Sequence, residues 1–187
     1  MSEIRLPESD VIEATRVWLE KAVIGLNLCP FAKSVHVKKQ IRYAVVPVES
    51  YQELLEELER ELQLLVDTDP AVTETTLLIH PYALDEFLDY SWFLPLAEKI
   101  LKDLGLLGEL QIAHFHPRFQ FSDCDVDDIE NYTNRAPYPT LHLIRESSID
   151  RAVAAFPDAA EIFERNIDTL RGMGHEGWRK LWQETGK

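Results

Sequence analysis

Residues 112–146 read IAHFHPRFQFSDCDVDDIENYTNRAPYPTLHLIRE, and this stretch predicts how the middle of the chain folds. An apolar strand runs into His116-Pro117, a long loop follows, and a second strand, PTLHLIR, returns. Loops of roughly twenty residues inside a compact domain are uncommon and are usually either functional or disordered. The loop is rich in aromatic residues, which favours an ordered, functional loop. These residues are Phe119, Phe121, Tyr132 and Tyr138.

Outside this stretch, hydrophobic periodicity predicts further strands at residues 41–48 and 75–80, besides those at 110–116 and 139–145. It predicts helices at 10–28, 50–68, 85–104, 148–156 and 158–171, with a final segment, 178–182, that docks back. Residues 27–33 are expected to form a compact turn, and Pro95 is expected to kink or divide its helix. Capping boxes are expected at Asp10/Glu13 and Ser50/Glu53, and Asp158 with Glu161 is expected to cap the helix that follows it.

Strands that alternate with helices predict an α/β fold. We expect a three- to four-stranded, mostly parallel sheet with an antiparallel last strand, because no helix separates the strands at 110–116 and 139–145. Helices pack on this sheet. The whole chain, 1–187, is expected to be a single α/β domain, with residues 147–187 as a helical C-terminal extension packed on the core.

The composition limits the class of protein. The chain has 187 residues, is 45% hydrophobic, and carries 19 basic against 33 acidic residues, a net charge of −14. Such an acidic chain is not expected to bind nucleic acid or an anionic membrane surface. No signal peptide or membrane-length apolar run is visible, and the two cysteines do not suggest a disulfide framework, so a cytoplasmic location is expected. The oligomeric state stays open.

Two predicted strands end in the same dipeptide, His80-Pro81 and His116-Pro117. Ligands of open α/β sheets bind outside the carboxyl ends of the strands, so both imidazoles are expected at one such edge, where the long loop also begins. Imidazole titrates near neutral pH, which makes His116, with His80 nearby, the candidate general acid or base. The alternative is that proline merely ends each strand.

Arginines near this edge suggest a pocket for an anion. Arg118 and Arg135 flank the loop, and guanidinium groups bind carboxylate or phosphate with two parallel hydrogen bonds. Arg145 is a possible third member, and Asn134 is expected to orient the substrate. The alternative is that each arginine pairs with an acidic residue and fixes the loop.

Cys29 is a further candidate for the substrate site, where it could act as a nucleophile; the alternative is a structural cysteine. It follows a predicted helix C-terminus, whose negative dipole end raises the pKa of a thiol. Cys124 lies among aspartates and is expected to be a poor thiolate.

No cofactor and no metal site are assigned, although a metal-assisted reaction stays open. His114, His116 and His142 or the acidic run 123–128 are the possible ligands. The run lacks the glycine and glutamate of a calcium loop, and buried core roles are favoured for His114 and His142.

Three stretches, LNLCPFA at 26–32, HPRFQF at 116–121 and NRAPYPTLHLIR at 134–145, resemble a family of uncharacterised bacterial proteins known as a domain of unknown function. The resemblance covers nearly the whole chain. It implies a bacterial origin and a single soluble domain, and it brings no activity, cofactor or catalytic residue.

The residues therefore predict a small soluble enzyme that acts on a small anionic substrate, a phosphate or carboxylate, by histidine acid/base chemistry, under a loop that closes over the substrate. The alternative is a non-catalytic module that binds a ligand or a protein through residues 118–138.

Overall fold

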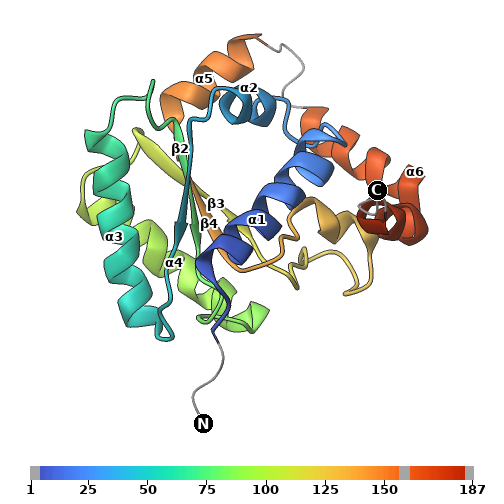
Figure 1. The fold of residues 1–187 in the computed structure, drawn as a ribbon, viewed down its shortest axis with the longest axis horizontal. Helices are drawn as coiled ribbons and strands as arrows, with labels where there is room; N and C mark the ends of the chain where they lie inside the picture. Colours follow the sequence, from blue (N-terminus) through green and yellow to red (C-terminus); the bar gives the residue numbers. More distant parts are fainter. Residues whose placement is uncertain (1–4, 156–160, 184–187) are drawn as a thin grey trace.

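The computed structural model describes residues 5–155 and 161–183, and its elements follow the alternation that the sequence predicts (Figure 1). The strands are β1 (Ile41–Val45), β2 (Thr75–Ile79), β3 (Leu110–Phe115) and β4 (Thr140–Arg145). The helices are α1 (Glu8–Trp18), η1 (Leu19–Ile24), α2 (Ala32–Val37), α3 (Tyr51–Asp67), α4 (Phe87–Asp103), η2 (Ile129–Thr133), α5 (Glu146–Ala155) and α6 (Ile162–Gln183). No helix among the described residues is long and apolar enough to cross a membrane.

The four strands form one mixed sheet in the order β1-β2-β4-β3. β1 pairs with β2 in parallel, and β4 runs antiparallel to both β2 and β3. Strands β1, β2 and β3 therefore share one direction, as predicted, and the predicted α/β class with an antiparallel last strand is confirmed. Because β4 is inserted between β2 and β3, the carboxyl ends of β2 and β3 lie at the same edge of the sheet with the start of β4 between them.

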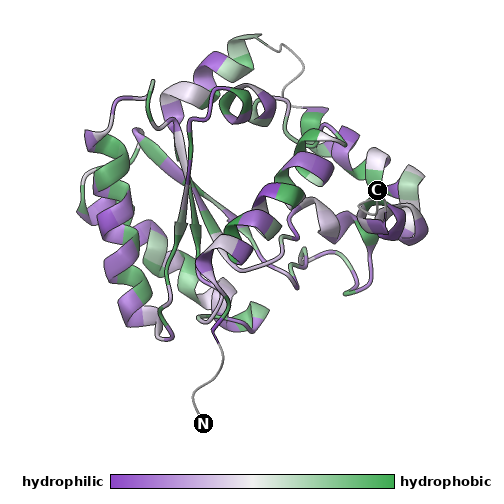
Figure 2. Ribbon diagram, in the orientation of Figure 1, coloured by the Kyte–Doolittle hydropathy of each residue, from purple (hydrophilic) through white to green (hydrophobic). Residues whose placement is uncertain are grey.

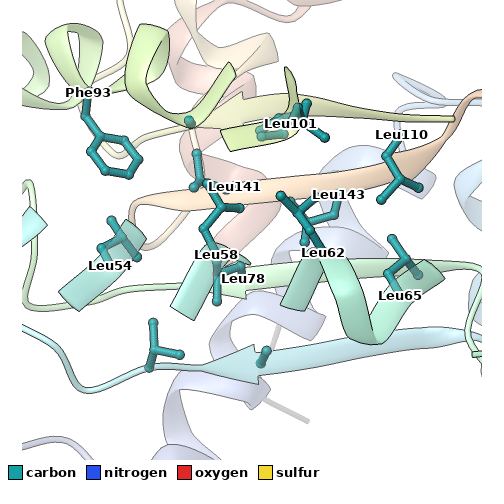
Figure 3. Packing of buried hydrophobic residues seen from close by; sticks show 14 of the residues in the cluster. Leu54, Leu58, Leu62, Leu65, Leu78, Phe93, Leu101, Leu110, Leu141 and Leu143 are labelled. Carbon is teal, nitrogen blue, oxygen red and sulfur yellow. The ribbon is translucent and has the colours of Figure 1, made fainter. Parts of the chain in front are cut away.

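Helices α3 and α4 cover one face of the sheet (Figure 1). α3 buries a leucine stripe at helical spacing, and Figure 2 shows hydrophilic residues interleaved with it along the helix. The predicted capping box is present, because the Ser50 hydroxyl accepts from the Glu53 N–H and the Glu53 carboxylate accepts from the Ser50 N–H. The stripe interlocks with α4 and with alternate residues of the strands (Figure 3). The principal members of the core that they form together are Leu54, Leu58, Leu62, Leu65, Leu78, Phe93, Leu101, Leu141 and Leu143.

The opposite face of the sheet is covered by α1, η1, α2 and α5, and α6 packs against η2 beside this layer. α1 begins after Pro7, which accepts the first helical hydrogen bonds through its carbonyl, and no side chain caps the helix. The predicted Asp10/Glu13 capping box is therefore wrong, because Asp10 already lies inside the first turn. The helix widens at its end into the π-helix η1, where the Gly25 N–H donates to the Glu20 carbonyl, and it ends before Leu28 as expected.

Other boundaries differ from the sequence prediction in informative ways. β1 ends at Val45, two residues before Pro47, instead of continuing to Val48. α4 continues through Pro95 as a single helix, so the alternative of two short helices is wrong. α2 was not predicted, because its six residues have no side-chain cap and follow the turn directly.

The C-terminal half of α6 packs back against earlier helices of the chain, as predicted. Gly174 has φ 64° and interrupts the helical geometry, so the chain changes direction there, a conformation that glycine adopts without strain. Trp178 then packs against Tyr132 of η2 and against Trp182, in the same apolar cluster as residues of η1. The predicted helix end at Phe156 and the cap at Asp158 lie outside the described residues.

Candidate functional site

His80 and His116 lie at the same edge of the sheet, one residue past the ends of β2 and β3. Both side chains are buried, on the face that α4 covers. The ring of Tyr90 lies between them, with centroid distances of 5.9 Å to His80 and 5.0 Å to His116. The two imidazoles thus converge from positions that are far apart along the chain.

Both ring nitrogens of His116 bond to the backbone. Nδ1 accepts from the Arg118 N–H at 3.0 Å, so the proton lies on Nε2, which donates to the Leu84 carbonyl at 3.1 Å. Burial lowers the pKa of His116, and the ring is held in one neutral tautomer. In this arrangement neither nitrogen is left to exchange a proton with a ligand.

His80 is different, because only one of its nitrogens is bonded. Nδ1 donates to the Ala83 carbonyl at 3.0 Å, whereas Nε2 is buried and has no hydrogen-bond partner. Burial lowers its pKa to about 4, so the ring is neutral near pH 7. The face of the ring stacks on Tyr90, which donates its hydroxyl proton to the Thr140 carbonyl.

The two arginines at this edge point to protein acceptors rather than into a shared pocket. Arg118 bonds the Asp85 carbonyl and carboxylate and forms an ion pair with Glu86 at 3.2 Å. Arg135 donates to two carbonyls of the loop, those of Phe119 at 3.1 Å and Val126 at 2.7 Å. Its guanidinium also lies over the ring of Tyr132, 4.3 Å from the centroid. Both side chains thus fix the ends of the loop.

Two asparagines complete the loop. Asn134 donates from Nδ2 to the His114 carbonyl at 3.1 Å and accepts from the Thr133 hydroxyl, which ties the loop to β3. Asn131, which the sequence did not single out, is fully buried; its Oδ1 accepts from the Phe121 N–H, and its Nδ2 donates to the Asp125 carbonyl. In the sequence, Asn131 is marked only by its place in a polar segment. That place does not show whether the side chain is buried and joins two parts of the loop or lies at the surface.

Arg145 lies at the other edge of the sheet, because β4 runs antiparallel. It is buried and donates to three carbonyls at and just past the C-terminus of α3, those of Leu65, Thr68 and Thr73. The idea that it joins Arg118 and Arg135 at one edge is therefore wrong, and its role is to cap a helix.

The three histidines proposed as metal ligands do not share a face. His142 pairs with Ala113, and His114 pairs with Leu141, so alternation along the strands sends His142 to one face of the sheet and His114, with His116, to the other. His142 therefore cannot join His114 and His116 around one metal ion, as the possible ligand set required. Within the described ranges, 5–155 and 161–183, no group of three or more histidine, cysteine or acidic side chains is arranged to hold a metal ion.

Cys29 lies on the same face as His142, away from His80 and His116. Burial raises the pKa of its thiol, although hydrogen bonds from the backbone N–H groups of Phe31 and Ala32 to the sulfur act in the opposite direction. The direction agrees with the sequence argument, but the cause is loss of hydration and not a helix dipole. Cys124, in the acidic run, also has a raised pKa.

Around Cys29 and His142 the structure contains a cavity of about 170 Å³ between the sheet and the helices η1, α2 and α5, which we call the sheet–helix cavity. Its wall is predominantly apolar, with His142 and Thr75 as polar groups on the sheet side. Figure 1 shows α2 and α5 at the same end of the molecule, above the strands. The lining residues are Trp18, Leu19, Val23, Cys29, Phe31, Ala32, Val35, Ile41, Glu74, Thr75, Leu77, Phe115, His142, Ile144, Ser148, Ile149 and Ala152.

Sequence reasoning missed this cavity. The residues come from four strands and four helices, so no local spacing marks them. The one available signal was that Cys29 and His142 each interrupt an apolar stretch, within LCPFA and TLHLI respectively.

Comparisons with known proteins add a family but no activity. A family model described as "Protein of unknown function (DUF1415)" matches residues 10–180. Neither the curated proteins nor the solved structures gave a match.

Proposed function

The chain belongs to the DUF1415 family of proteins of unknown function, and we propose from its geometry that it binds a small, predominantly apolar molecule in the sheet–helix cavity. The observation that carries this proposal is the cavity itself: a partly open space of about 170 Å³, lined mainly by aromatic and aliphatic side chains, with few polar groups. Small-molecule sites have this character, an apolar wall with a few placed polar groups.

The size of the cavity sets the size of the ligand. An apolar cavity of about 150 Å³ in another protein stays free of water and binds benzene. The sheet–helix cavity is slightly larger, so its occupant is expected to be about the size of a substituted single ring.

Stability gives a second argument. Apolar side chains that line an unfilled space lack dispersion contacts on that side, and this loss costs stability. A ligand restores these lost contacts, and its binding offsets the cost.

Toluene is the appropriate first probe, because it is apolar and matches the expected size. We expect wild-type protein to bind one toluene, measured by titration in ligand-observed NMR, with a matching rise in melting temperature. Ala152, which is nearly fully buried on α5, lines the cavity, so Ala152→Phe should fill the space and abolish the binding. Ala154→Phe, on the exposed side of the same helix, is the matched control and should bind toluene as the wild type does.

Cys29 provides an independent readout. In a Cys124→Ser background Cys29 is the only thiol, and it lines the cavity. Saturating toluene should slow its reaction with N-ethylmaleimide. If toluene neither binds the wild type nor protects Cys29, the proposal fails.

The catalytic hypothesis for the histidine edge stays a prediction. The convergence of His80 and His116 supports it, whereas the bonds of His116 and Arg118 to protein groups count against it, since an anion would have to displace Asp85 and Glu86 from Arg118. Phosphate titration followed by NMR tests it. Phosphate-dependent shifts of the Arg118 and Arg135 side-chain signals would support it, and their absence would end it.

A further inference from the structure

The hydrogen bonds of His142 define its tautomer. Its Nε2 lies 2.8 Å from the Thr75 hydroxyl oxygen, and the same hydroxyl donates its single proton to the Leu143 carbonyl at 2.6 Å. The hydroxyl has no second proton to give, so it accepts from the imidazole. Nε2 therefore carries the ring proton, and Nδ1 has a free lone pair.

This lone pair is available to a ligand. No described residue forms a hydrogen bond with His142 Nδ1. Among the described residues, the polar side-chain atoms that are both fully buried and without a partner are Tyr43 OH, Thr76 Oγ1, His80 Nε2 and Arg145 Nε. His142 Nδ1 lacks a partner but is not in this group, so it is not fully buried. Nδ1 thus retains accessible surface. The imidazole is partly accessible and lines the sheet–helix cavity, so this surface belongs to the cavity.

The other polar groups of the wall already have partners. The Glu74 carboxylate accepts from the Ser148 hydroxyl and from Arg151, which lies 2.6 Å away. The Cys29 sulfur accepts from the backbone N–H groups at the start of α2. His142 Nδ1 is consequently the acceptor best placed to receive a proton donor from an occupant.

Charge narrows the class of occupant further. Among the described residues that line the wall there is no lysine or arginine, so a carboxylate or phosphate would enter without a counter-charge from them. Burial lowers the pKa of His142 to about 4, so the ring is not a cation near pH 7. A cationic ligand would meet only the Glu74 carboxylate, which is already paired with Arg151.

We propose that the occupant is a neutral apolar molecule of about single-ring size with one hydroxyl or N–H group, which donates a hydrogen bond to His142 Nδ1. This inference rests on the proposed function and specifies its ligand class. Thr75 is a positioning residue, because it holds the proton on Nε2 and leaves Nδ1 as the acceptor.

The test compares phenol with toluene, which have nearly the same shape and differ in a hydroxyl in place of a methyl group. The ratio of their association constants is measured in the wild type and in His142→Phe, so the different hydration of the two probes cancels. We expect the ratio of phenol to toluene to fall about tenfold in His142→Phe, the size of one lost hydrogen bond to a buried partner. Benzoate should bind neither protein.

Thr75 variants test the positioning role. Thr75→Val should lower the same ratio, because the imidazole can then move its proton to Nδ1, and Thr75→Ser should restore the ratio because it keeps the hydroxyl. A merely structural role of Thr75 would change the affinities for phenol and toluene equally and leave the ratio unchanged.

A further test uses the wild-type protein alone, so its outcome does not depend on whether a variant folds. The ¹⁵N signals of the His142 ring should show a protonated Nε2 and an unprotonated Nδ1 in the free protein, and phenol, but not toluene, should shift the Nδ1 signal. If neither probe binds, the proposed function fails. If both bind while the ratio is unchanged in His142→Phe and Nδ1 does not shift, the proposed function stands and this inference is overturned.

Discussion

The backbone N–H of Arg118 donates a hydrogen bond of 3.0 Å to Nδ1 of His116, two residues earlier in the chain. Together with the bond from Nε2 to the Leu84 carbonyl, it makes the buried imidazole a bridge between the start of the loop and the turn before α4. His116→Ala removes both bonds and leaves a space, so we expect it to destabilise the protein by about 2–4 kcal/mol in urea unfolding. A catalytic role alone would leave the stability unchanged.

His175→Ala is the control for this variant, because His175 is exposed on α6. Its stability should stay within about 0.5 kcal/mol of wild type. Equal stabilities of His116→Ala and His175→Ala would contradict the structural role and restore His116 as a candidate for catalysis.

Buried histidines also predict how stability depends on pH. Burial lowers the pKa values of His80 and His142 to about 4, against about 6.5 in an unfolded chain. Between these values the unfolded chain binds more protons, so stability falls as the pH falls from about 6.5 towards about 4. Each residue contributes on the order of 3 kcal/mol over this window.

Urea unfolding at a series of pH values measures this dependence. His142→Phe removes one of the two groups, so its slope between pH 6.5 and 4.5 should be smaller than that of the wild type. Identical slopes for wild type and His142→Phe would show that His142 does not fold as a buried neutral ring.

Much of the fold could be predicted because it depends on residue patterns. Leu54, Leu58, Leu62 and Leu65 marked a buried helix face, and the Ser50/Glu53 pair marked its start. No crossover helix was expected between the strands at 110–116 and 139–145, which gave the antiparallel pairing of β3 and β4; the short helix η2 lies between them without acting as a crossover. The meeting of His80 and His116 at one edge followed from the common direction of β2 and β3.

The partners of the site residues could not be predicted, for a physical reason. His116 and Arg135 bond to backbone carbonyls or N–H groups, which every residue possesses, so no residue type in the sequence marks the contact. The separation of His142 from His114 depends on the register of β3 against β4, because a shift of one residue would reverse the faces.

Arg145 illustrates a buried cation with a purely structural role. It is 7% exposed and donates to the carbonyls of Leu65, Thr68 and Thr73 at 2.5, 2.7 and 3.2 Å. These carbonyls end α3 and begin the turn after it, where a cation is favourable. Arg145→Met keeps the apolar stem but removes the guanidinium donor from all three carbonyls, of which that of Leu65 keeps the Thr68 N–H as a donor. We therefore expect a loss of about 3 kcal/mol of stability in urea unfolding.

Arg60→Met provides the comparison, because Arg60 is on the exposed face of α3 and its side chain, 65% exposed, pairs with Glu57 one turn earlier. This change should alter the stability by less than about 0.5 kcal/mol. A loss for Arg145→Met that is no larger than for Arg60→Met would refute the capping role.

Asn131 bridges two segments of the long loop through its side-chain amide. It is fully buried; its Oδ1 accepts from the Phe121 N–H at 2.9 Å, and its Nδ2 donates to the Asp125 carbonyl at 2.8 Å. Asn131→Asp keeps the shape and the acceptor but replaces the donor with a carboxylate oxygen that faces a carbonyl. We expect hydrogen exchange of the backbone amides in residues 119–128 to become at least about tenfold faster, since a buried polar group left without its partner costs about 1–3 kcal/mol. Asp127→Asn, an exposed change in the same loop, should leave the exchange unchanged. If the loop amides of Asn131→Asp exchange at the wild-type rate, the loop is held by the Arg135 contacts instead, and Arg135→Met should then release it.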